Sequence, residues 1–221
     1  ALNGQPIPLV RGGPVRMIVP WAHGFKSVKF LQHIRLTNDY RPNDTYAAID
    51  GSVEGNDPSG VQKTYTTVDL ARDAPPTHAG SAVRLSGLIT SGRTPASHLE
   101  YWVRGPDPRL QRAPPLADDD PEVAAGPWVR FELPPPPDLR QVLPGTITPS
   151  ELHGVDEAGL PERWPLPFSY LQWAVDIPLA IPGYYEIRCR AVDVADNAQP
   201  EPRPHRKNGR NSIECRRVRV V

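Results

Sequence analysis

Two basic residues on either side of a glycine-containing loop are the best candidates for chemistry in this chain. Arg16 ends the run GGPVR, and Lys29 follows Ser27 and Val28 beyond the loop. Glycine lets a backbone approach a ligand closely, and Arg and Lys side chains donate hydrogen bonds to phosphate oxygens. A helix that starts at Ser27 would also point the amides of Val28 and Lys29 at the loop. The pattern indicates a site for a phosphate-bearing ligand.

Composition alone favours a plainer interpretation of the same two cations, with Arg16 at a strand edge and Lys29 exposed on a helical turn. The elements expected around them are a turn at Asn3-Gly4, a strand over about residues 15–19, a helical turn from Ser27 and a strand over about residues 33–37. Residues 1–45 are too few to bury a core. We therefore expect this segment to pack on another part of the protein.

The charge balance limits the kind of partner. The 221 residues carry 25 Lys and Arg against 25 Asp and Glu, a formal net charge of zero. Binding to nucleic acid through bulk charge needs a cationic surplus, so we expect no nucleic-acid partner. No apolar run approaches the roughly 20 residues that cross a bilayer. We expect no membrane span, and nothing at the start resembles a signal peptide.

Proline and short strand-like runs shape the rest of the chain. The 29 prolines predict short strands joined by long irregular loops, because proline disfavours helices and central strands. Seven alternating or β-branched runs follow residue 63: TYTTVDLA, SAVRLSGLIT, HLEYWVRG, WVRFELP, SYLQWAVDIPL, YYEIRCRAVDV and IECRRVRVV. Such a series is typical of an immunoglobulin-like sandwich, here over residues 64–221. Residues 46–63 are expected to be a connecting arm. The long loops over 106–127 and 134–167 are expected on the surface, as decoration or as docking sites.

Other residue patterns offer little chemistry. The six histidines form no i, i+4 pair, no phosphate-binding or nucleophile motif is present, and the run Asp118-Asp119-Asp120 is expected in a solvated turn. We therefore expect no metal ligands in this chain. Cys189 and Cys215 lie in strand-like runs without zinc-site spacing. Two free, buried thiols are favoured over a disulfide between neighbouring strands.

Both ends of the chain resemble one enzyme family. The run NGQPIPLVRGGPVRMIVPWAHGFKSVKFLQHIRLT resembles a segment of the sulfite oxidase family of molybdopterin enzymes, which reads NG-x-P-L-P, then G-x-P-V-R, P-G-x-x-G and V-K-W-L. Phe30 replaces the family's usual Trp. PGYYEIRCRAVDVADNAQPEPRP resembles its signature with R-A-x-D and N-x-Q-P, and NSIECRRVRV resembles its closing strand.

The resemblance implies a fold and a cofactor. Members of the family hold molybdenum–molybdopterin in an α+β domain. An immunoglobulin-like dimerisation domain comes after it in the chain. Residues 1–45 would then form the C-terminal edge of the cofactor domain. The cofactor-binding residues that the resemblance implies are Arg11, Arg16, Ser27, Val28 and Lys29. Arg11 stands where the family often has histidine.

The family's molybdenum-ligating cysteine has no counterpart in this sequence, because neither Cys189 nor Cys215 matches its context. The resemblance thus implies a cofactor shared with an upstream chain, or with a missing N-terminal part, that carries the catalytic cysteine. The family's substrate-binding arginine falls on Cys215. Strand residues alternate between faces, so Arg217 shares the face of Cys215 and is a candidate contact for an oxyanion substrate. No other catalytic residue is expected here.

The favoured hypothesis is a subunit or fragment of a sulfite-oxidase-like molybdenum oxidoreductase that completes the molybdopterin pocket and mediates subunit association. The implied chemistry is oxygen-atom transfer with a cytochrome as electron acceptor, and the family suggests the periplasm. The alternative is a non-catalytic β-sandwich interaction module derived from that family. A carbohydrate-binding sandwich would use Trp102, Trp128, Trp164 and Trp173, but Trp102 and Trp173 lie in strands and are expected in the core.

Overall fold

The computed structural model describes most of the chain as two separate compact units. The described residues are 4–20, 27–36, 62–69, 75–142, 145, 148, 151–201 and 211–221. The first unit comprises Ala1–Gln62 and Arg203–Arg210, and the second comprises Lys63–Pro202 and Asn211–Val221. Most of the predicted arm over 46–63, and the loop around Gly24, lie outside the described residues. Within the described part of the chain, no helix has the length and apolar character needed to cross a membrane.

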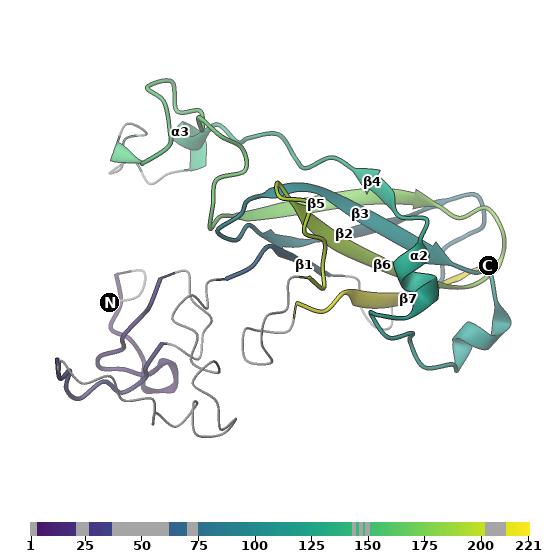
Figure 1. The fold of residues 1–221 in the computed structure, drawn as a ribbon, viewed down its shortest axis with the longest axis horizontal. Coiled ribbons are helices and arrows are strands. Elements are labelled where there is room, and N and C mark those ends of the chain that lie inside the picture. Colours follow the sequence, from purple (N-terminus) through teal and green to yellow (C-terminus); the bar gives the residue numbers. More distant parts are fainter. Residues whose placement is uncertain are drawn as a thin grey trace. The chain divides into compact units, whose positions relative to one another are not determined.

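The second unit consists of two antiparallel sheets (Figure 1). The first sheet has the order β1-β2-β5, from β1 (Tyr65–Val68), β2 (Ala82–Thr90) and β5 (Tyr170–Pro178). The second has the order β4-β3-β6-β7, from β4 (Val129–Phe131), β3 (Ala96–Arg104), β6 (Gly183–Asp193) and β7 (Glu214–Val220). Each strand overlaps one of the seven predicted runs, and only β3 and β6 begin before their runs, by two residues and one residue. The mainly β fold predicted from the sequence is therefore confirmed.

One hydrophobic core fills the space between the sheets. In β2, Val83 and Leu85 are buried while Arg84 between them is exposed, as the period of two in a half-buried strand requires. The core draws on both sheets, with Trp173 from the first and Ile187 from the second. Each such side chain contributes roughly 1.5–3 kcal/mol by leaving water. This shared core makes the unit a β-sandwich.

The predicted core tryptophans are confirmed, each with a different environment. Trp173 is 4% exposed, and its Nε1–H donates to Thr66 Oγ1 at 2.6 Å. Trp102 is 2% exposed and lies in a second, smaller cluster with Val123 and Ile213. Buried indoles need an acceptor or a cation–π partner, and the hydroxyl of Thr66 supplies the acceptor for Trp173.

The loop over residues 106–127 packs on the outer face of the four-stranded sheet. It contains η4 (Pro108–Gln111) and α2 (Pro121–Ala125), which bury Leu110 and Val123. Each short helix begins with an Asp-Pro step, and the carboxylate of Asp120, for example, accepts a hydrogen bond from Glu122 N–H at 2.9 Å. The loop is thus an ordered cover over the sheet. The loop over 134–167 contains α3 (Leu139–Val142) and is anchored where Trp164 Nε1–H donates to Pro134 O at 2.8 Å.

The C-terminal signature of the sequence has a structural role. Gln199 is 1% exposed, and its Oε1 accepts the N–H groups of Thr66 (2.8 Å) and Ala191 (2.9 Å). Its Nε2 donates to Ser212 O at 3.1 Å. Because Thr66 lies in β1 and Ala191 in β6, one buried amide joins the two sheets.

The N-terminal unit departs from the predicted elements. Its only helix among the described residues is η1 (Leu9–Arg11), a single 3-10 turn. The strand predicted over 15–19 is wrong, as is the described part of the one over 33–37. Met17 N–H donates to Val28 O and Leu31 N–H to Val15 O, each at 2.9 Å. Pro14 and Pro20 bracket the first run and have no amide donors to extend this pairing into a ladder.

The helical turn predicted from Ser27 is also wrong, since no helix occurs over 27–36. Ser27 Oγ accepts a hydrogen bond from Val19 N–H at 3.3 Å instead of capping its own turn. Phe30 has a φ of 54°, which is incompatible with a right-handed helix. The phosphate site therefore cannot rely on a helix start at Ser27.

Candidate cofactor-binding segment

The turn at η1 is the centre of the N-terminal unit. Pro8 O accepts a hydrogen bond from Arg11 N–H at 2.9 Å, and Leu9 O accepts one from Gly12 N–H at 2.8 Å. Gly12 ends the turn in the left-handed region with a φ of 93°, which glycine adopts without steric cost. The carbonyls of the next two residues, Val10 and Arg11, instead accept hydrogen bonds from side chains.

Both predicted cations reach this turn. Arg16 Nη1 donates to Arg11 O at 3.3 Å, and Lys29 Nζ donates to Val10 O at 3.1 Å. Because Val10 and Arg11 are consecutive, the two cationic groups end close together on one turn. Arg16 Nε is buried and has no acceptor among the described residues. The cationic groups of Arg16 and Lys29 therefore both donate to this turn, and the Nε–H of Arg16 could donate to a further acceptor.

The other three predicted residues belong to the same connected set. Ser27 and Val28 join the two runs of the segment through their bonds to Val19 and Met17. Arg11 exposes its side chain, and its carbonyl receives Arg16. The structure thus places Arg11, Arg16 and Lys29 at one turn, whereas Ser27 and Val28 contact the run that contains Met17 and Val19.

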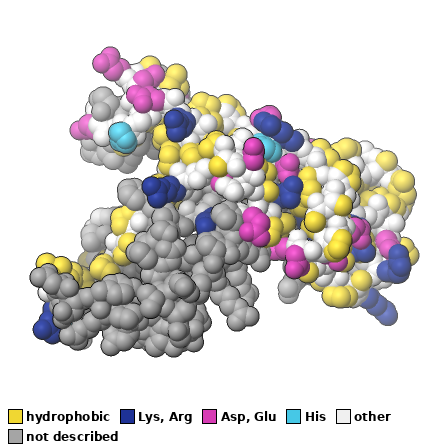
Figure 2. Space-filling model, in the orientation of Figure 1, with side chains coloured by type: hydrophobic (Ala, Val, Ile, Leu, Met, Phe, Trp, Pro, Cys, Tyr) yellow, Lys and Arg dark blue, Asp and Glu magenta, His cyan; other side chains and the backbone are white. Residues whose placement is uncertain are grey.

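Large apolar side chains are exposed throughout this segment, and hydrophobic side chains at its surface are visible in Figure 2. The residues with 44–94% of their surface exposed are Leu9, Val10, Val15, Ile18, Val28, Phe30, Ile34 and Leu36. No described residue over 4–36 belongs to the buried hydrophobic core. Single exposed apolar residues are ordinary, whereas so dense a set marks a contact surface. The segment has no core of its own among its described residues, as its length predicted.

Comparison with known proteins identifies this segment. Residues 1–45 match the family model described as oxidoreductase molybdopterin binding domain. The N-terminal segment is thus similar to the molybdopterin-binding domain of oxidoreductases. The resemblance noted in the sequence is thereby confirmed for this molybdopterin-binding segment, whose described part is 4–20 and 27–36.

The curated relatives match over a similarly short length. The chain is 44% identical over 45 residues to the protein-methionine-sulfoxide reductase catalytic subunit MsrP of Gluconobacter oxydans, covering 20% of this chain and 14% of that protein. The same subunit from Xanthomonas campestris pv. campestris is 50% identical over 34 residues, covering 15% of this chain and 11% of that protein. The chain therefore matches only a small part of the length of these relatives.

One solved structure is similar over more of the chain. The sulfane dehydrogenase SoxCD from Paracoccus pantotrophus aligns with 73% of this chain and 33% of that chain, at 15% identity and a TM-score of 0.36. A likeness this distant carries no argument about function.

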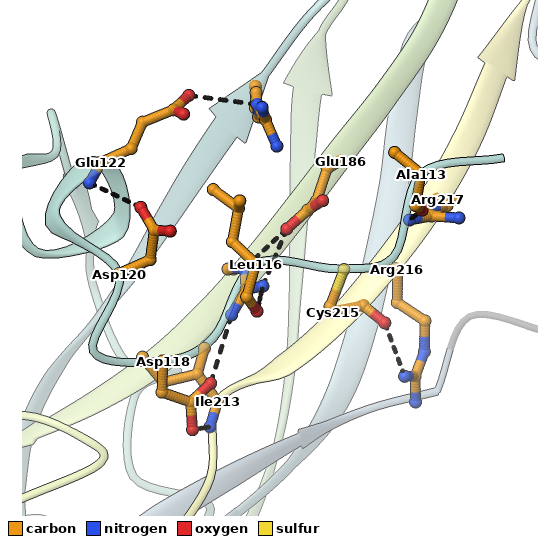
Figure 3. Close-up of polar contacts among 12 residues, drawn as sticks. Ala113, Leu116, Asp118, Asp120, Glu122, Glu186, Ile213, Cys215, Arg216 and Arg217 are labelled. Carbon is orange, nitrogen blue, oxygen red and sulfur yellow. Dashed lines mark hydrogen bonds and ion pairs between the residues drawn. The ribbon is translucent and has the colours of Figure 1, made fainter. Parts of the chain in front are cut away.

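The substrate-contact candidate Arg217 lies outside the molybdopterin-binding segment, on the outer face of β7. Its guanidinium donates to Ala113 O in the 106–127 loop (Figure 3). Arg216 donates to Val68 O at 2.5 Å and so faces the other sheet. Arg217 and Cys215 pair with Glu186 and Arg188 of β6, so both lie on the same face of the sheet. The Arg217 guanidinium is therefore bonded to the loop. That Arg217 contacts a substrate stays a prediction.

A buried ion cluster under the same loop was missed from the sequence. Arg188 and Glu186 are 1% and 0% exposed, and Arg188 Nη2 lies 2.8 Å from Glu186 Oε1. Asp118 Oδ1 accepts from Arg188 Nη1 at 3.2 Å, and Asp118 Oδ2 from Ile213 N–H at 3.1 Å (Figure 3). Asp118 lies in the predicted turn, but its carboxylate is largely buried rather than solvated. In YYEIRCRAVD charged residues alternate with apolar ones, which indicates one solvated face, whereas the loop buries the charged face and the core buries the other.

The two cysteines lie on opposite faces of the four-stranded sheet. Cys189 is paired with Glu214 across β6 and β7, and Cys215 is paired with Arg188. Adjacent positions along a strand face opposite sides, so Cys189 lies in the core and Cys215 lies beneath the loop. Both are free thiols, which confirms that prediction, although Cys215 is only half-buried.

Both thiols are expected to resist alkylation at pH 8. Burial raises the pKa of Cys189 to about 12, and burial together with the Glu186 carboxylate raises the pKa of Cys215 to about 12. Since the thiolate is the nucleophile, only about one thiol in ten thousand is reactive at that pH. Iodoacetamide followed by mass spectrometry should label neither cysteine in the native chain and both in urea. Native labelling of Cys215 at the rate of an unfolded thiol would contradict this.

The same shifts predict a loss of stability in alkali. An unfolded thiol ionises near its ordinary pKa of 9.0, below the folded value. The unfolded state therefore releases protons first, and the contribution of each thiol to stability is full below about pH 9 and falls towards pH 12. Replacing both cysteines by serine should remove this part of the alkaline loss in urea titrations.

Proposed function

We propose that this chain is a subunit or fragment of a sulfite-oxidase-like molybdenum oxidoreductase. Residues 1–45 form the C-terminal edge of the molybdopterin-binding domain, residues 46–63 connect it to the sandwich, and residues 64–221 form an immunoglobulin-like domain that mediates subunit association. The strand orders β1-β2-β5 and β4-β3-β6-β7 support this assignment, because β4 beside β3 extends the second sheet as in variable-type immunoglobulin domains.

The observation that carries the proposal is the meeting of Arg16 and Lys29 at the Val10–Arg11 carbonyls. A phosphate-bearing cofactor fits these donors, because two cations stand at one turn and Arg16 Nε is a buried donor without a described acceptor. Arg16 and Lys29 bind the cofactor phosphate, Arg11 adds a third cation, and Ser27 and Val28 hold the two runs in register. Bound molybdenum–molybdopterin supplies the oxygen-atom transfer chemistry.

The exposed apolar residues support a polypeptide partner for this segment. Side chains such as Ile18, Phe30 and Leu36, which are 64%, 54% and 94% exposed, are suited to the core of a larger cofactor domain. We propose that the partner is the upstream part of that domain, which carries the molybdenum-ligating cysteine. A cytochrome is the proposed electron acceptor.

The experiment is to produce this chain together with an upstream cofactor-domain chain and to measure bound cofactor. The double variant Arg16→Ala, Lys29→Ala should retain less than about a tenth of the wild-type molybdopterin, because each lost charge-assisted bond costs roughly 1.5–3 kcal/mol. Cofactor content is read from the fluorescence of the released, oxidised pterin and from molybdenum by mass spectrometry.

A matched control removes two cations outside the turn. The double variant Arg35→Ala, Lys63→Ala should keep wild-type cofactor content, since neither residue is assigned to the cofactor phosphate. If the Arg16, Lys29 variant also kept its cofactor, the assignment would fail. That result would favour the alternative, a non-catalytic β-sandwich interaction module.

A further inference from the structure

The Lys29 side chain lies directly across Gly12. Gly12 is buried, and a Cβ built on it would stand 2.6 Å from Lys29 Cγ and 2.7 Å from Lys29 Cβ. Carbon atoms in contact normally keep about 3.5–4.0 Å. Any side chain at Gly12 would therefore have to displace Lys29.

Two hydrogen bonds hold Lys29 in this place from both ends. Gly12 O accepts from Phe30 N–H at 3.1 Å, which fixes the backbone next to Lys29. Val10 O accepts from Lys29 Nζ at 3.1 Å, which fixes the ammonium group. The lysine thus spans the turn, with its aliphatic stem on the glycine between the two anchors.

The conformation of Phe30 supports the same arrangement. Phe30 has a φ of 54°, and the left-handed region costs a non-glycine residue roughly 1–2 kcal/mol. Phe30 is 54% exposed, so burial of its own ring does not account for this conformation. The bend lies between two hydrogen bonds of the segment, from Phe30 N–H to Gly12 O at 3.1 Å and from Leu31 N–H to Val15 O at 2.9 Å.

We infer that Gly12 is a positioning residue, which acts by leaving room for Lys29 beside Arg16 on the η1 turn. The inference rests on the proposed function only in assigning these cations to a cofactor phosphate. The placement of Lys29 stands on the contacts themselves. Gly12 is thus needed twice, for its φ of 93° and for the absent Cβ.

The test combines Gly12→Ala and Lys29→Ala in a double-mutant cycle. Cofactor content of the co-produced assembly should fall about as far in Gly12→Ala as in Lys29→Ala, roughly tenfold for one charge-assisted bond. The double variant should lose little more than either single variant, because both changes remove the same contact. Additive losses would overturn the inference.

Gly4 provides a matched control for backbone strain. It has a φ of 76°, yet a Cβ there would meet no atom within 4 Å. Gly4→Ala therefore adds similar strain without touching a cation, and it should leave cofactor content unchanged. A loss in Gly4→Ala equal to that in Gly12→Ala would show that strain alone is responsible and would overturn the inference.

A second readout separates this inference from the proposed function. Acetylation of Lys29 in the 221-residue chain, followed by mass spectrometry with Lys63 as the internal reference, should be about twofold or more faster in Gly12→Ala, because the ammonium loses its acceptor. An unchanged rate would overturn the positioning role. A faster rate with wild-type cofactor content would leave the positioning role intact and overturn the assignment to the cofactor.

Discussion

Replacing Arg188 by alanine is expected to lower the free energy of unfolding by about 3–5 kcal/mol. Arg188 and Glu186 are almost completely buried, and Arg188 Nε donates to Glu186 Oε1 at 2.9 Å. The guanidinium also donates to Leu116 O at 2.5 Å and to Asp118 Oδ1 at 3.2 Å. Without it, the Glu186 carboxylate would stay buried with no cation in contact. The loop over 106–127 would also lose its central anchor.

Arg84 is the matched control for this change. It pairs with Asp176 at 3.2 Å on the open face of the three-stranded sheet, where the two side chains are 69% and 55% exposed. Exposed pairs contribute about 0–1 kcal/mol, so Arg84→Ala should be nearly neutral. Urea denaturation of both variants measures the difference. Equal effects would show that the buried cluster does not hold the fold.

A second pair of changes tests why removal of Arg188 is costly. The variant Glu186→Leu, Arg188→Met removes both charges and keeps apolar volume. It should recover most of the loss seen in Arg188→Ala, because the penalty comes from an unpaired buried charge rather than from the missing bond. If it is no more stable than Arg188→Ala, the loop is held by the specific contacts of the guanidinium.

Replacing Gly87 by alanine is expected to cost about 1–3 kcal/mol or more. Gly87 lies in β2, paired with Val68 in β1 and Trp173 in β5. A Cβ there would stand 1.9 Å from Thr67 O and 2.7 Å from the Trp173 ring. The first of these is a backbone atom of the neighbouring strand, so the clash cannot be relieved by rotating a side chain. The change should push β1 away from β2.

Gly145 is the control for this second change. Its φ does not lie in the left-handed region, and a Cβ there would meet no atom within 4 Å. Gly145→Ala should therefore leave the urea midpoint unchanged. In Gly87→Ala, hydrogen exchange should be faster at the amides of β1 than at those of β6, because β1 is the displaced edge strand. Uniformly unchanged exchange would contradict the proposed displacement.

The β-sandwich could be predicted because strand patterns are local. The run SAVRLSGLIT alternates apolar and polar residues, and the structure buries Val83 and Leu85 while exposing Arg84. All seven runs formed strands, although β6 is buried on both faces rather than on one. The strand predicted in the N-terminal segment did not form, because the run GGPVRMIVP has apolar residues without alternation and prolines at both ends. Its apolar side chains reflect a contact surface rather than a strand of its own.

By itself, the sequence determined the seven strands and the free thiols, because composition and alternation are carried by neighbouring residues. The assignment of five residues around Arg16 and Lys29 to the cofactor stays a prediction. Tertiary structure alone decided that Arg16 and Lys29 meet at the Val10–Arg11 carbonyls over Gly12. It also decided that the Asp118 carboxylate is largely buried and pairs with Arg188. Contacts between residues far apart in the chain depend on how loops pack, and no local pattern encodes that packing.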